Sequence, residues 1–344
     1  MSIITGPPTV RRFLIRIALV VSALAISACF SACACTDNKP AIPPDKLTIA
    51  YNAPPFTVLA DIAQAQGYFR LEGLEVTPVF YSSGKAALDE VLEGKADLAI
   101  AAETPIMFAI MKGQKISIIA TIQSSNKNAA IVARKDRSIS TLSDLKGKKI
   151  GVNLGTNGEF FMDSFLAIHG MARQDITVVD LKPAEIPEAL VRGDIDAVSA
   201  WSPFLGQAQK ELGDKGVTFY DQDIYTETSN LAATQESIRK NPARVRKVLL
   251  ALLKAEEFVM HHPDEAQKIV AEFRQMKQDL LGELWPNNTF SVTLDQSLIL
   301  SLEDESRWAI KSRLTNATKI PNYLNFIYLD GLVSVKPKAV RIIR

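Results

Sequence analysis

Short apolar runs alternate with helical spacings along most of the chain. Leu47 to Ala50 forms a β-rich run, Val58 begins a helical spacing that ends at Gly67, and Leu74 to Phe80 alternates as a strand does. The same order continues with a helix before Gly94 and then with three further segments: strand 98–101, helix 106–112 and strand 116–121. Strands that alternate with helices predict a mainly parallel sheet covered by helices.

The order repeats over residues 149–222. The predicted strands there are 149–153, 176–180, 197–200 and 217–219, and the predicted helices are 159–169, 186–192 and 204–212. From Asn241 onward the apolar spacing is helical, and Pro242 stands where proline favours a first helical turn. The pattern therefore predicts an α/β fold in two halves with helices at the end.

The two halves share an internal echo. Residues 92–99 (LEGKADLA) and 191–198 (VRGDIDAV) each end a helix on glycine and place an aspartate before a strand. The strands then lead into Glu103-Thr104-Pro105 and Trp201-Ser202-Pro203. A hydroxyl followed by proline predicts an N-cap with proline at the first helical position. Two helices should therefore begin at corresponding places.

A second pair of turns matches more loosely. Tyr81-Ser82-Ser83-Gly84 and Gly155-Thr156-Asn157-Gly158 each follow a strand and precede a helix. Open α/β sheets bind ligands beyond the carboxyl ends of their strands, and helix N-termini there offer N–H groups to anions. If the halves face each other, four turns line one cleft. The alternative is that these residues only cap helices.

Length and charge narrow the class of protein. At about 150 residues per domain, 344 residues favour two domains. Lys and Arg number 39 against 38 Asp and Glu, and three of the basic residues are Arg11, Arg12 and Arg16 in the N-terminal segment, so 36 remain beyond residue 28. Nucleic-acid binders need clustered basic side chains. The slightly acidic remainder excludes that class.

The first 35 residues have the features of an export signal. The three arginines precede an apolar run, 17–26, that is too short to span a bilayer. Ile26-Ser27-Ala28-Cys29 resembles a bacterial lipobox, which implies cleavage after residue 28 and lipidation of Cys29; Cys33 is the rival site, and an ordinary secretory signal is the alternative. Residues 29–45, with the proline-rich stretch 40–44, form a stiff linker.

Several segments together resemble the nitrate, aliphatic-sulfonate and taurine solute-binding proteins of bacterial ABC importers, which are similar to thiamin-pyrimidine synthases. They are 67–69 (GYF), 72–76 (EGLEV), 83–84 (SG), 94–99, 104–105 (TP), 144–151 (DLKGKKIG), 155–156 (GT) and 193–201. The resemblance covers residues 46 to about 330.

The resemblance implies a type II periplasmic binding fold of two α/β lobes. Lobe 1 would comprise residues 46–130 and 230–344, lobe 2 residues 131–229, and the two crossover strands would lie near 128–135 and 229–234. Such a receptor closes on its solute, so that the bound state signals to the transporter. The implied partners are a permease and its ATPase, and a periplasmic, membrane-anchored monomer is expected.

Carried onto matching positions, the family's binding site would use hydroxyls and backbone N–H groups for an anionic head. Trp201 and Phe56 would flank an organic tail. The implied site residues are Tyr51, Asn52, Ser82, Ser83, Gly84, Glu103, Thr104, Gly155, Thr156, Asn157, Trp201 and Tyr225.

Glu103 argues against a plain anion, because two like charges in a poorly solvated cleft repel each other strongly. It would instead grip an ammonium, which favours a zwitterion such as taurine or a nitrogen heterocycle such as a thiamin-precursor pyrimidine. The alternative is that Glu103 points to solvent or caps the adjoining helix. None of the four turns contains an arginine.

Enzymatic chemistry has little support in the sequence. The histidines, His169, His261 and His262, are read as helix termini; no metal spacing is present, and no cofactor is expected. The thiamin-pyrimidine synthases carry a cysteine-rich active-site motif, whereas this chain has no cysteine after residue 35. Trp285 and Trp308 are predicted to be core residues. A non-catalytic sensor that signals to a membrane receptor is the other alternative.

Overall fold

The structure, a computed structural model, describes residues 43–53 and 55–343. The predicted leader 1–28 and the candidate lipidation sites Cys29 and Cys33 lie outside these residues. Within the described part, no helix is both long and apolar enough to cross a lipid bilayer.

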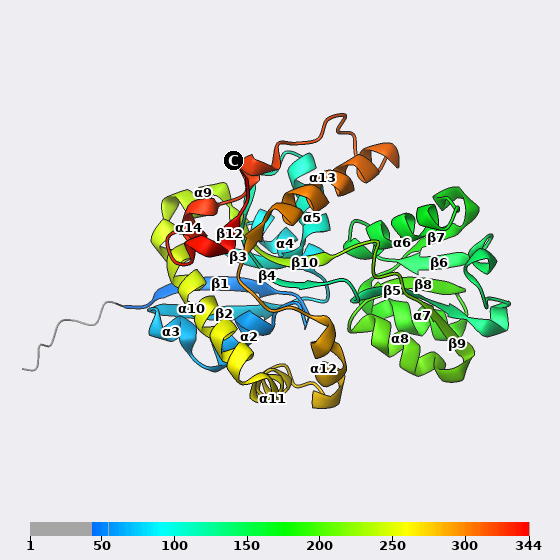
Figure 1. The fold of residues 1–344 in the computed structure, drawn as a ribbon, viewed down its shortest axis with the longest axis horizontal. Coiled ribbons are helices and arrows are strands. Elements are labelled where there is room, and N and C mark those ends of the chain that lie inside the picture. The colour runs from blue at the N-terminus through cyan, green and yellow to red at the C-terminus, as the bar shows by residue number, and fades with distance from the viewer. Residues whose placement is uncertain (1–42, 54, 344) are drawn as a thin grey trace, which may run out of the picture. The chain divides into compact units, whose positions relative to one another are not determined.

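The first of two five-stranded sheets has the order β2-β1-β3-β10-β4 (Figure 1). β1 pairs in parallel with β2 and β3, whereas β10 is antiparallel to β3 and to β4. Its strands are β1 (Asp45–Tyr51), β2 (Leu74–Phe80), β3 (Leu98–Ala102), β4 (Ile116–Ser125) and β10 (Glu227–Thr234).

The second sheet repeats this plan in the order β7-β6-β8-β5-β9. β6 is parallel to β7 and β8, and β5 is antiparallel to β8 and β9. Its strands are β5 (Ala129–Arg134), β6 (Lys149–Val152), β7 (Thr177–Asp180), β8 (Ala197–Trp201) and β9 (Gly216–Phe219). Both sheets are therefore mixed rather than mainly parallel, because the strand entering from the other sheet runs against β3 or β8.

The chain passes between the sheets twice. Residues 126–128 join β4 to β5, and residues 220–226 join β9 to β10. The ranges expected to cross, 128–135 and 229–234, instead form ladder strands just after each passage. Backbone pairing explains the difference, since a strand buried between two partners satisfies its own N–H and C=O groups.

Helices cover both sheets (Figure 1). α2 (Val58–Ala65), α3 (Tyr68–Leu71), α10 (Pro242–His261) and α11 (Pro263–Phe273) pack together, and α4 (Gly84–Leu92) and α5 (Glu103–Met111) pack on the first sheet. α13 (Gln296–Lys311) lies on α5, and α9 (Gln235–Lys240) follows β10. The remaining elements are α6 (Asn157–Ile168), α7 (Ile186–Arg192), α8 (Phe204–Leu212), α12 (Gln278–Leu284), α14 (Leu329–Val333), β11 (Leu294–Asp295) and β12 (Val340–Arg341).

Alternate residues of β5 face opposite sides of the second sheet, and each side is covered by helices. Ile131 and Ala133 belong to the apolar core under α6, whereas Ala130 and Val132 belong to the core under α7 and α8. Successive residues of a strand point to opposite faces, so a strand that is apolar at every position is covered on both sides.

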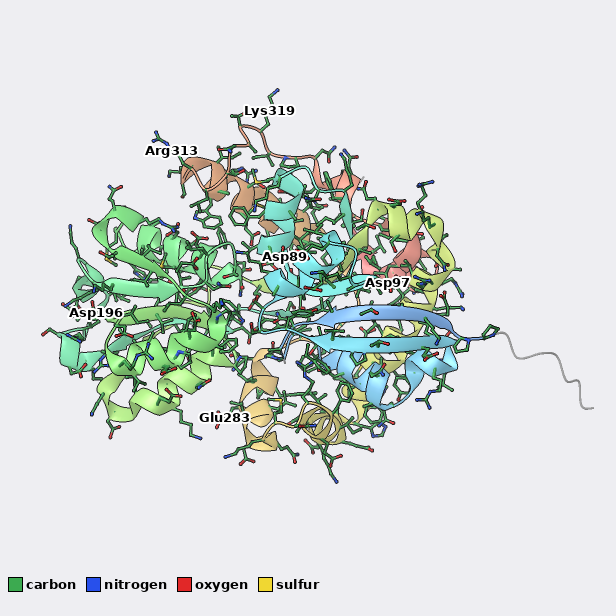
Figure 2. All side chains as sticks on the ribbon, turned by 180° about the vertical axis from the view of Figure 1, so that it is seen from behind. Asp89, Asp97, Asp196, Glu283, Arg313 and Lys319 are labelled. Carbon is green, nitrogen blue, oxygen red and sulfur yellow. The ribbon has the colours of Figure 1, made fainter. Side chains whose placement is uncertain are left out.

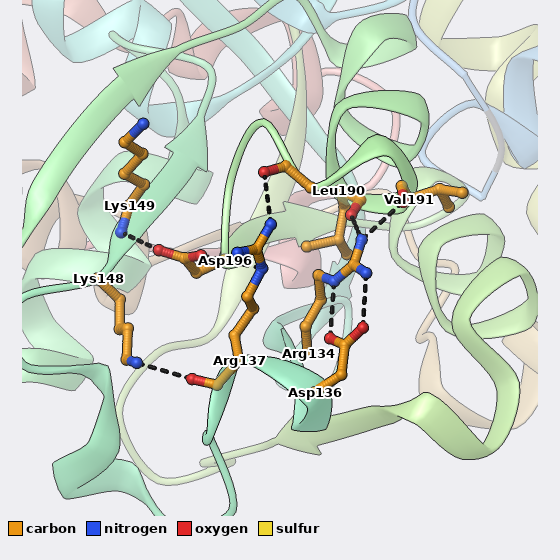
Figure 3. A network of polar contacts seen from close by, with 9 residues as sticks. Arg134, Asp136, Arg137, Lys148, Lys149, Leu190, Val191 and Asp196 are labelled. Carbon is orange, nitrogen blue, oxygen red and sulfur yellow. Dashed lines mark hydrogen bonds and ion pairs between the residues drawn. The ribbon is translucent and has the colours of Figure 1, made fainter.

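The sequence echo has a structural meaning. Asp97 donates its backbone N–H to Thr48 O and accepts the Thr48 N–H on its carboxylate, at 2.9 and 2.7 Å. Asp196 makes the same two bonds with Lys149, both at 2.9 Å. Figure 2 labels both aspartates, and Figure 3 shows the Asp196 carboxylate bond. Each aspartate therefore fixes the start of a strand, at the end of the sheet opposite the candidate turns.

A second polar network lies at the C-terminal end of β5 in the second sheet. Arg134, at the end of β5, pairs with Asp136 and donates to the carbonyls of Leu190 and Val191 at 2.6 Å (Figure 3). These carbonyls lie in the last turn of α7, where they lack partners within the helix. The Arg134 guanidinium thus caps the C-terminus of α7 and links that helix to β5.

Candidate functional site

Two candidate residues follow β1 and are buried. Tyr51 donates its hydroxyl to Ala60 O at 3.3 Å, and the Asn52 side chain accepts the N–H of Ala53 at 2.7 Å. The Asn52 carbonyl accepts a bond from Arg274 at 2.9 Å. Phe56 is buried as well, with 1% of its surface exposed. These contacts stay within the surroundings of the first sheet.

The turn before α4 brings a helix start unusually close to a strand. Ser83 Oγ accepts the Ala86 N–H at 3.2 Å, so Ser83 caps the helix, and Ser82 is exposed. A Cβ on Gly84 would lie 2.8 Å from the Cα of Ala101 in β3. Glycine is required here because α4 rests directly on the backbone of β3.

Glu103 and Thr104 begin α5 and are fully buried. Glu103 Oε2 accepts the Thr228 N–H at 2.8 Å and its hydroxyl at 2.6 Å, while Thr104 Oγ1 donates to Glu305 Oε1 at 2.8 Å. Glu103 does not point to solvent. The predicted Thr104 N-cap is wrong, since the helix begins at Glu103 with Ala102 as its N-cap residue, and the Thr104 hydroxyl donates to a buried carboxyl.

The corresponding turn before α6 meets the passage into β10. Gly155 has a positive φ of 74° and donates its N–H to Glu159, and Thr156 Oγ1 donates to Asn153 O at 2.6 Å. Asn157 Nδ2 donates to Glu227 Oε1. Asn157 lies on a helix of the second sheet and Glu227 begins a strand of the first, so this bond joins the two sheets.

Trp201 and Tyr225 occupy different surroundings. Trp201 is 2% exposed and packs on α6, where a Cβ on Gly158 would lie 3.1 Å from its ring. The predicted Ser202 N-cap of α8 is also wrong, because that helix starts at Phe204 and its N-cap residue is Pro203. Tyr225 is 8% exposed, and its buried hydroxyl has no hydrogen-bond partner in the part of the chain that the structure describes.

The contacts of Glu103, Thr104 and Asn157 converge on a cluster of three buried carboxyls. We call Glu103, Glu227 and Glu305 the carboxyl triad; their exposed fractions are 0%, 2% and 0%. Tyr51, Asn52, Ser83 and Trp201 make none of these hydrogen bonds. The structure thus brings together only part of the predicted set.

The triad is electrostatically unusual. Burial raises the pKa of Glu103 from 4.5 to about 7, although bonds from Thr228 oppose the rise. Burial, and then the charge of Glu103, raise the pKa of Glu227 and of Glu305 well above the ordinary range. None of the three forms an ion pair with a lysine or arginine of the described residues. At neutral pH the triad therefore retains protons.

An aromatic layer lies beside the triad. Phe160 contacts Tyr225 and Trp308 edge-to-face, each with ring centroids 5.2 Å apart, and Trp308 contacts Phe108 at 5.7 Å. On each of three helices a polar residue precedes an aromatic residue by about one turn. The pairs are Asn157 and Phe160 on α6, Glu305 and Trp308 on α13, and Thr104 and Phe108 on α5. Positions three or four apart share a helix face. Polar and aromatic layers therefore adjoin between α5, α6 and α13.

A cavity of about 550 Å³ lies next to these layers. Phe108, Glu159 and Lys85 are among the residues that line it. Lys85 lies on α4, and its Nζ donates to the carbonyl oxygen of Leu154, 2.9 Å away. Among the described residues no three His, Cys, Asp or Glu side chains lie close enough to hold a metal ion.

Residues 59–266, more than half of the chain, match the family model described as NMT1/THI5 like. The chain belongs to this family. The resemblance drawn from the sequence is thereby confirmed, and so is the periplasmic binding protein fold, in the mixed-sheet form described above.

One relative of this chain is named as a binding protein and another as an enzyme. A Bacillus subtilis protein, provisionally named an aliphatic sulfonates-binding protein, is 25% identical over 231 residues, 66% of this chain and 69% of the relative. A 4-amino-5-hydroxymethyl-2-methylpyrimidine phosphate synthase of Saccharomyces cerevisiae is 24% identical over 252 residues, 69% and 74% of the two chains.

The fold is shared with a solved structure. The periplasmic aliphatic sulphonate binding protein SsuA of Escherichia coli superposes with a TM-score of 0.70 at 19% identity, covering 83% of this chain and 98% of that one. Proteins similar to this chain thus carry the names of a binding protein and of a synthase, and a shared fold does not decide between these functions.

Sequence reasoning missed two members of the triad. Glu305 lies on the same buried face of α13 as Leu298, Leu302 and Ala309. A glutamate at an apolar position of an amphipathic helix could therefore have indicated a buried carboxyl. Glu227 opens a strand whose first four residues, ETSN, are polar and nevertheless buried. Trp308, predicted as core, is half-buried and donates its Nε1–H to Asp163 of α6 at 2.9 Å.

Proposed function

We propose that this chain is the extracytoplasmic solute-binding component of an ABC importer and carries out no reaction itself. Its lobes are residues 46–130 with 230–344, and residues 131–229. It is held at the membrane by lipidated Cys29 and delivers a small solute to a permease as a monomer. Binding proteins among its relatives and structural neighbours support this role, whereas the yeast synthase supports an enzyme.

The observation that carries the proposal is the meeting of both sheets at buried polar groups. Asn157 starts a helix of the second sheet, Glu227 starts the strand that re-enters the first, and Thr104 and Glu305 complete the contact. Thr104 and Asn157 follow the carboxyl ends of β3 and β6, where open α/β sheets bind ligands. Within residues 55–343 the chain passes between the sheets only twice, which suits a hinge that lets them separate and admit a solute.

Solute binding should stabilise the purified protein and change its tryptophan fluorescence. Candidate solutes are sulfonates, taurine, nitrate, thiamin-precursor pyrimidines and aromatic acids, with the cations described below. A solute at 100 times its Kd adds about 2.7 kcal/mol of stability. Trp308 reports because it joins α13 to Phe160 and Asp163 of α6. Thermal unfolding and emission spectra measure the two effects.

Tryptophan variants provide the control. Trp308→Phe should reduce the ligand-dependent emission change, with Trp201 as the remaining reporter beside α6, whereas Trp285→Phe should retain it. Trp285 packs on Phe290, with their ring centroids 4.6 Å apart. A folded protein that responds to no solute would contradict the proposed function. Turnover of a bound compound, seen by product analysis, would favour the enzyme.

A further inference from the structure

Each member of the carboxyl triad has one oxygen that accepts no hydrogen bond from a backbone, amide, hydroxyl or basic group of residues 43–53 and 55–343. These are Glu103 Oε1, Glu227 Oε2 and Glu305 Oε2, all buried. The hydroxyls of Tyr225 and Ser229, two residues to either side of Glu227, are buried and unpartnered as well. Buried polar atoms are normally satisfied, and each exception needs a physical explanation. In the solute-free protein the retained protons serve these oxygens, and Glu103 and Glu305 lie close enough to share one. A ligand with several donors could replace those protons.

A ligand that replaces these protons should be positive. The charge of Glu103 raises the proton affinity of Glu227 and of Glu305, and no basic side chain of the described residues pairs with the three carboxyls. Bringing an anion into this site would add a like charge in a poorly solvated place, whereas a cation with several N–H donors would satisfy the unpartnered oxygens.

We propose that the solute carries a cationic nitrogen group of the amidinium, guanidinium or ammonium type, and that the carboxyl triad binds it. This deepens the proposed function and rests on it. Glu103 and Glu305 hold the group from the first sheet, and Glu227 binds it at the passage from the second. The triad lacks the spacing of a metal site within the described residues, which suits a larger organic cation.

The aromatic layer fits the rest of such a solute. Phe160, Trp308 and Phe108 lie one helical turn from the polar positions, and aromatic faces attract cations as well as flat apolar groups. The rings pack on each other in this structure, and the triad has no solvent access. The solute would therefore part α6 from α5 and α13, and the rings would close on it.

Several other charged groups on the packed elements have partners, whereas Asp89 of α4 lines the adjacent cavity, and its burial raises its pKa. Glu159 and Asp163 of α6 pair with Arg173 at 2.7 and 2.9 Å, and Lys85 of α4 binds a carbonyl oxygen. On α13, Glu303 and Asp304 pair with Arg307. Because the triad holds protons when empty, a cation should displace them. Affinity should then rise with pH between 5 and 8.

Benzamidine, benzylamine and phenylguanidine test the inference against benzenesulfonate and benzamide, which match them in ring size. All three cations stay charged up to pH 8, so protons released on binding come from the protein. We expect at least one cation to raise the unfolding midpoint, and calorimetry in two buffers of different ionisation enthalpy to detect proton release. The sulfonate and the amide should have no effect.

Conservative variants separate binding from folding. Glu305→Gln and Glu227→Gln should each weaken cation binding tenfold or more and reduce proton release, with circular dichroism unchanged. The matched control is Glu303→Gln on the same helix, a partly exposed residue that pairs with Arg307 and should bind as the wild type does.

Three results would overturn the inference. They are binding of benzenesulfonate but of no cation, cation binding without proton release and unchanged in Glu305→Gln, and no binding by any cation to the folded protein. If an anion or neutral solute of the wider panel binds, the solute-binding function stands and only the cation inference fails. If no compound binds, both fail.

Discussion

Replacing Glu103 by glutamine should make the solute-free protein more stable than the wild type at pH 8 and leave it equally stable at pH 4. The pKa of Glu103 rises from 4.5 to about 7 on folding because the side chain is buried, which corresponds to about 3 kcal/mol. The amide keeps the oxygen that accepts both Thr228 bonds and never ionises. It therefore resembles the protonated acid at every pH.

The direction follows from proton binding. Between pH 4.5 and 7 the folded wild type binds more protons at Glu103 than the unfolded chain does. Stability therefore falls as pH rises through this window, and the contribution of Glu103 is complete only below pH 4.5. Asp61, whose pKa burial raises to about 6, adds to the slope in both proteins and cancels in the comparison.

Chemical denaturation at pH 4 and pH 8, followed by circular dichroism, measures the difference. Glu303→Gln is the control and should show the pH dependence of the wild type. A Glu103→Gln protein whose stability falls with pH as steeply as that of the wild type would show that Glu103 is already ionised, or solvated, in the folded chain.

Replacing Gly84 by alanine should destabilise the fold by roughly 3 kcal/mol, because the added methyl has nowhere to go. Its carbon would lie 2.8 Å from Ala101 Cα and 3.1 Å from Ala102 N, both backbone atoms of β3. Relief would require α4 to move off the sheet, which would expose Ala87, Leu88 and Val91. Thermal and chemical unfolding at fixed pH measure the loss.

Gly206→Ala is the matched control within a helix of the second sheet. The nearest atom to its added methyl is Leu280 Cδ1 at 3.9 Å, so the substitution only improves helix propensity. We expect a gain of about 0.5–1 kcal/mol. If Gly84→Ala is as stable as the wild type, α4 does not rest on β3 as described.

The periodicity of the sequence predicted the alternating strands and helices closely. The predicted ranges of β2, α7 and α8 coincide with the structure, because apolar spacing and a glycine or turn at each end leave little freedom. The C-terminal third was predicted less well. Residues 312–328 and 334–343 are mostly irregular, since they pack by individual side chains rather than by a repeating face.

The site could be predicted only in part. Glu103 and Asn157 were found through turns that recur in both halves, and both take part in the buried contacts. Glu305 is 202 positions beyond Glu103 in the sequence, and nothing local indicates that two such distant carboxyls share one buried place. Local patterns also favoured Thr104 as a cap, whereas a partner brought by tertiary packing took its hydroxyl.

The order of the strands also affects biosynthesis. Every strand of the second sheet lies within residues 129–219, whereas the first sheet lacks β10 until residues 227–234 have been made. β10 lies between β3 and β4, so without it the first sheet is split. A nascent chain of about 225 residues already contains every strand of the second sheet, so that sheet can form before the first one is complete. Until β10 is made, β3 and β4 of the first sheet each have an unpaired edge that a chaperone could protect.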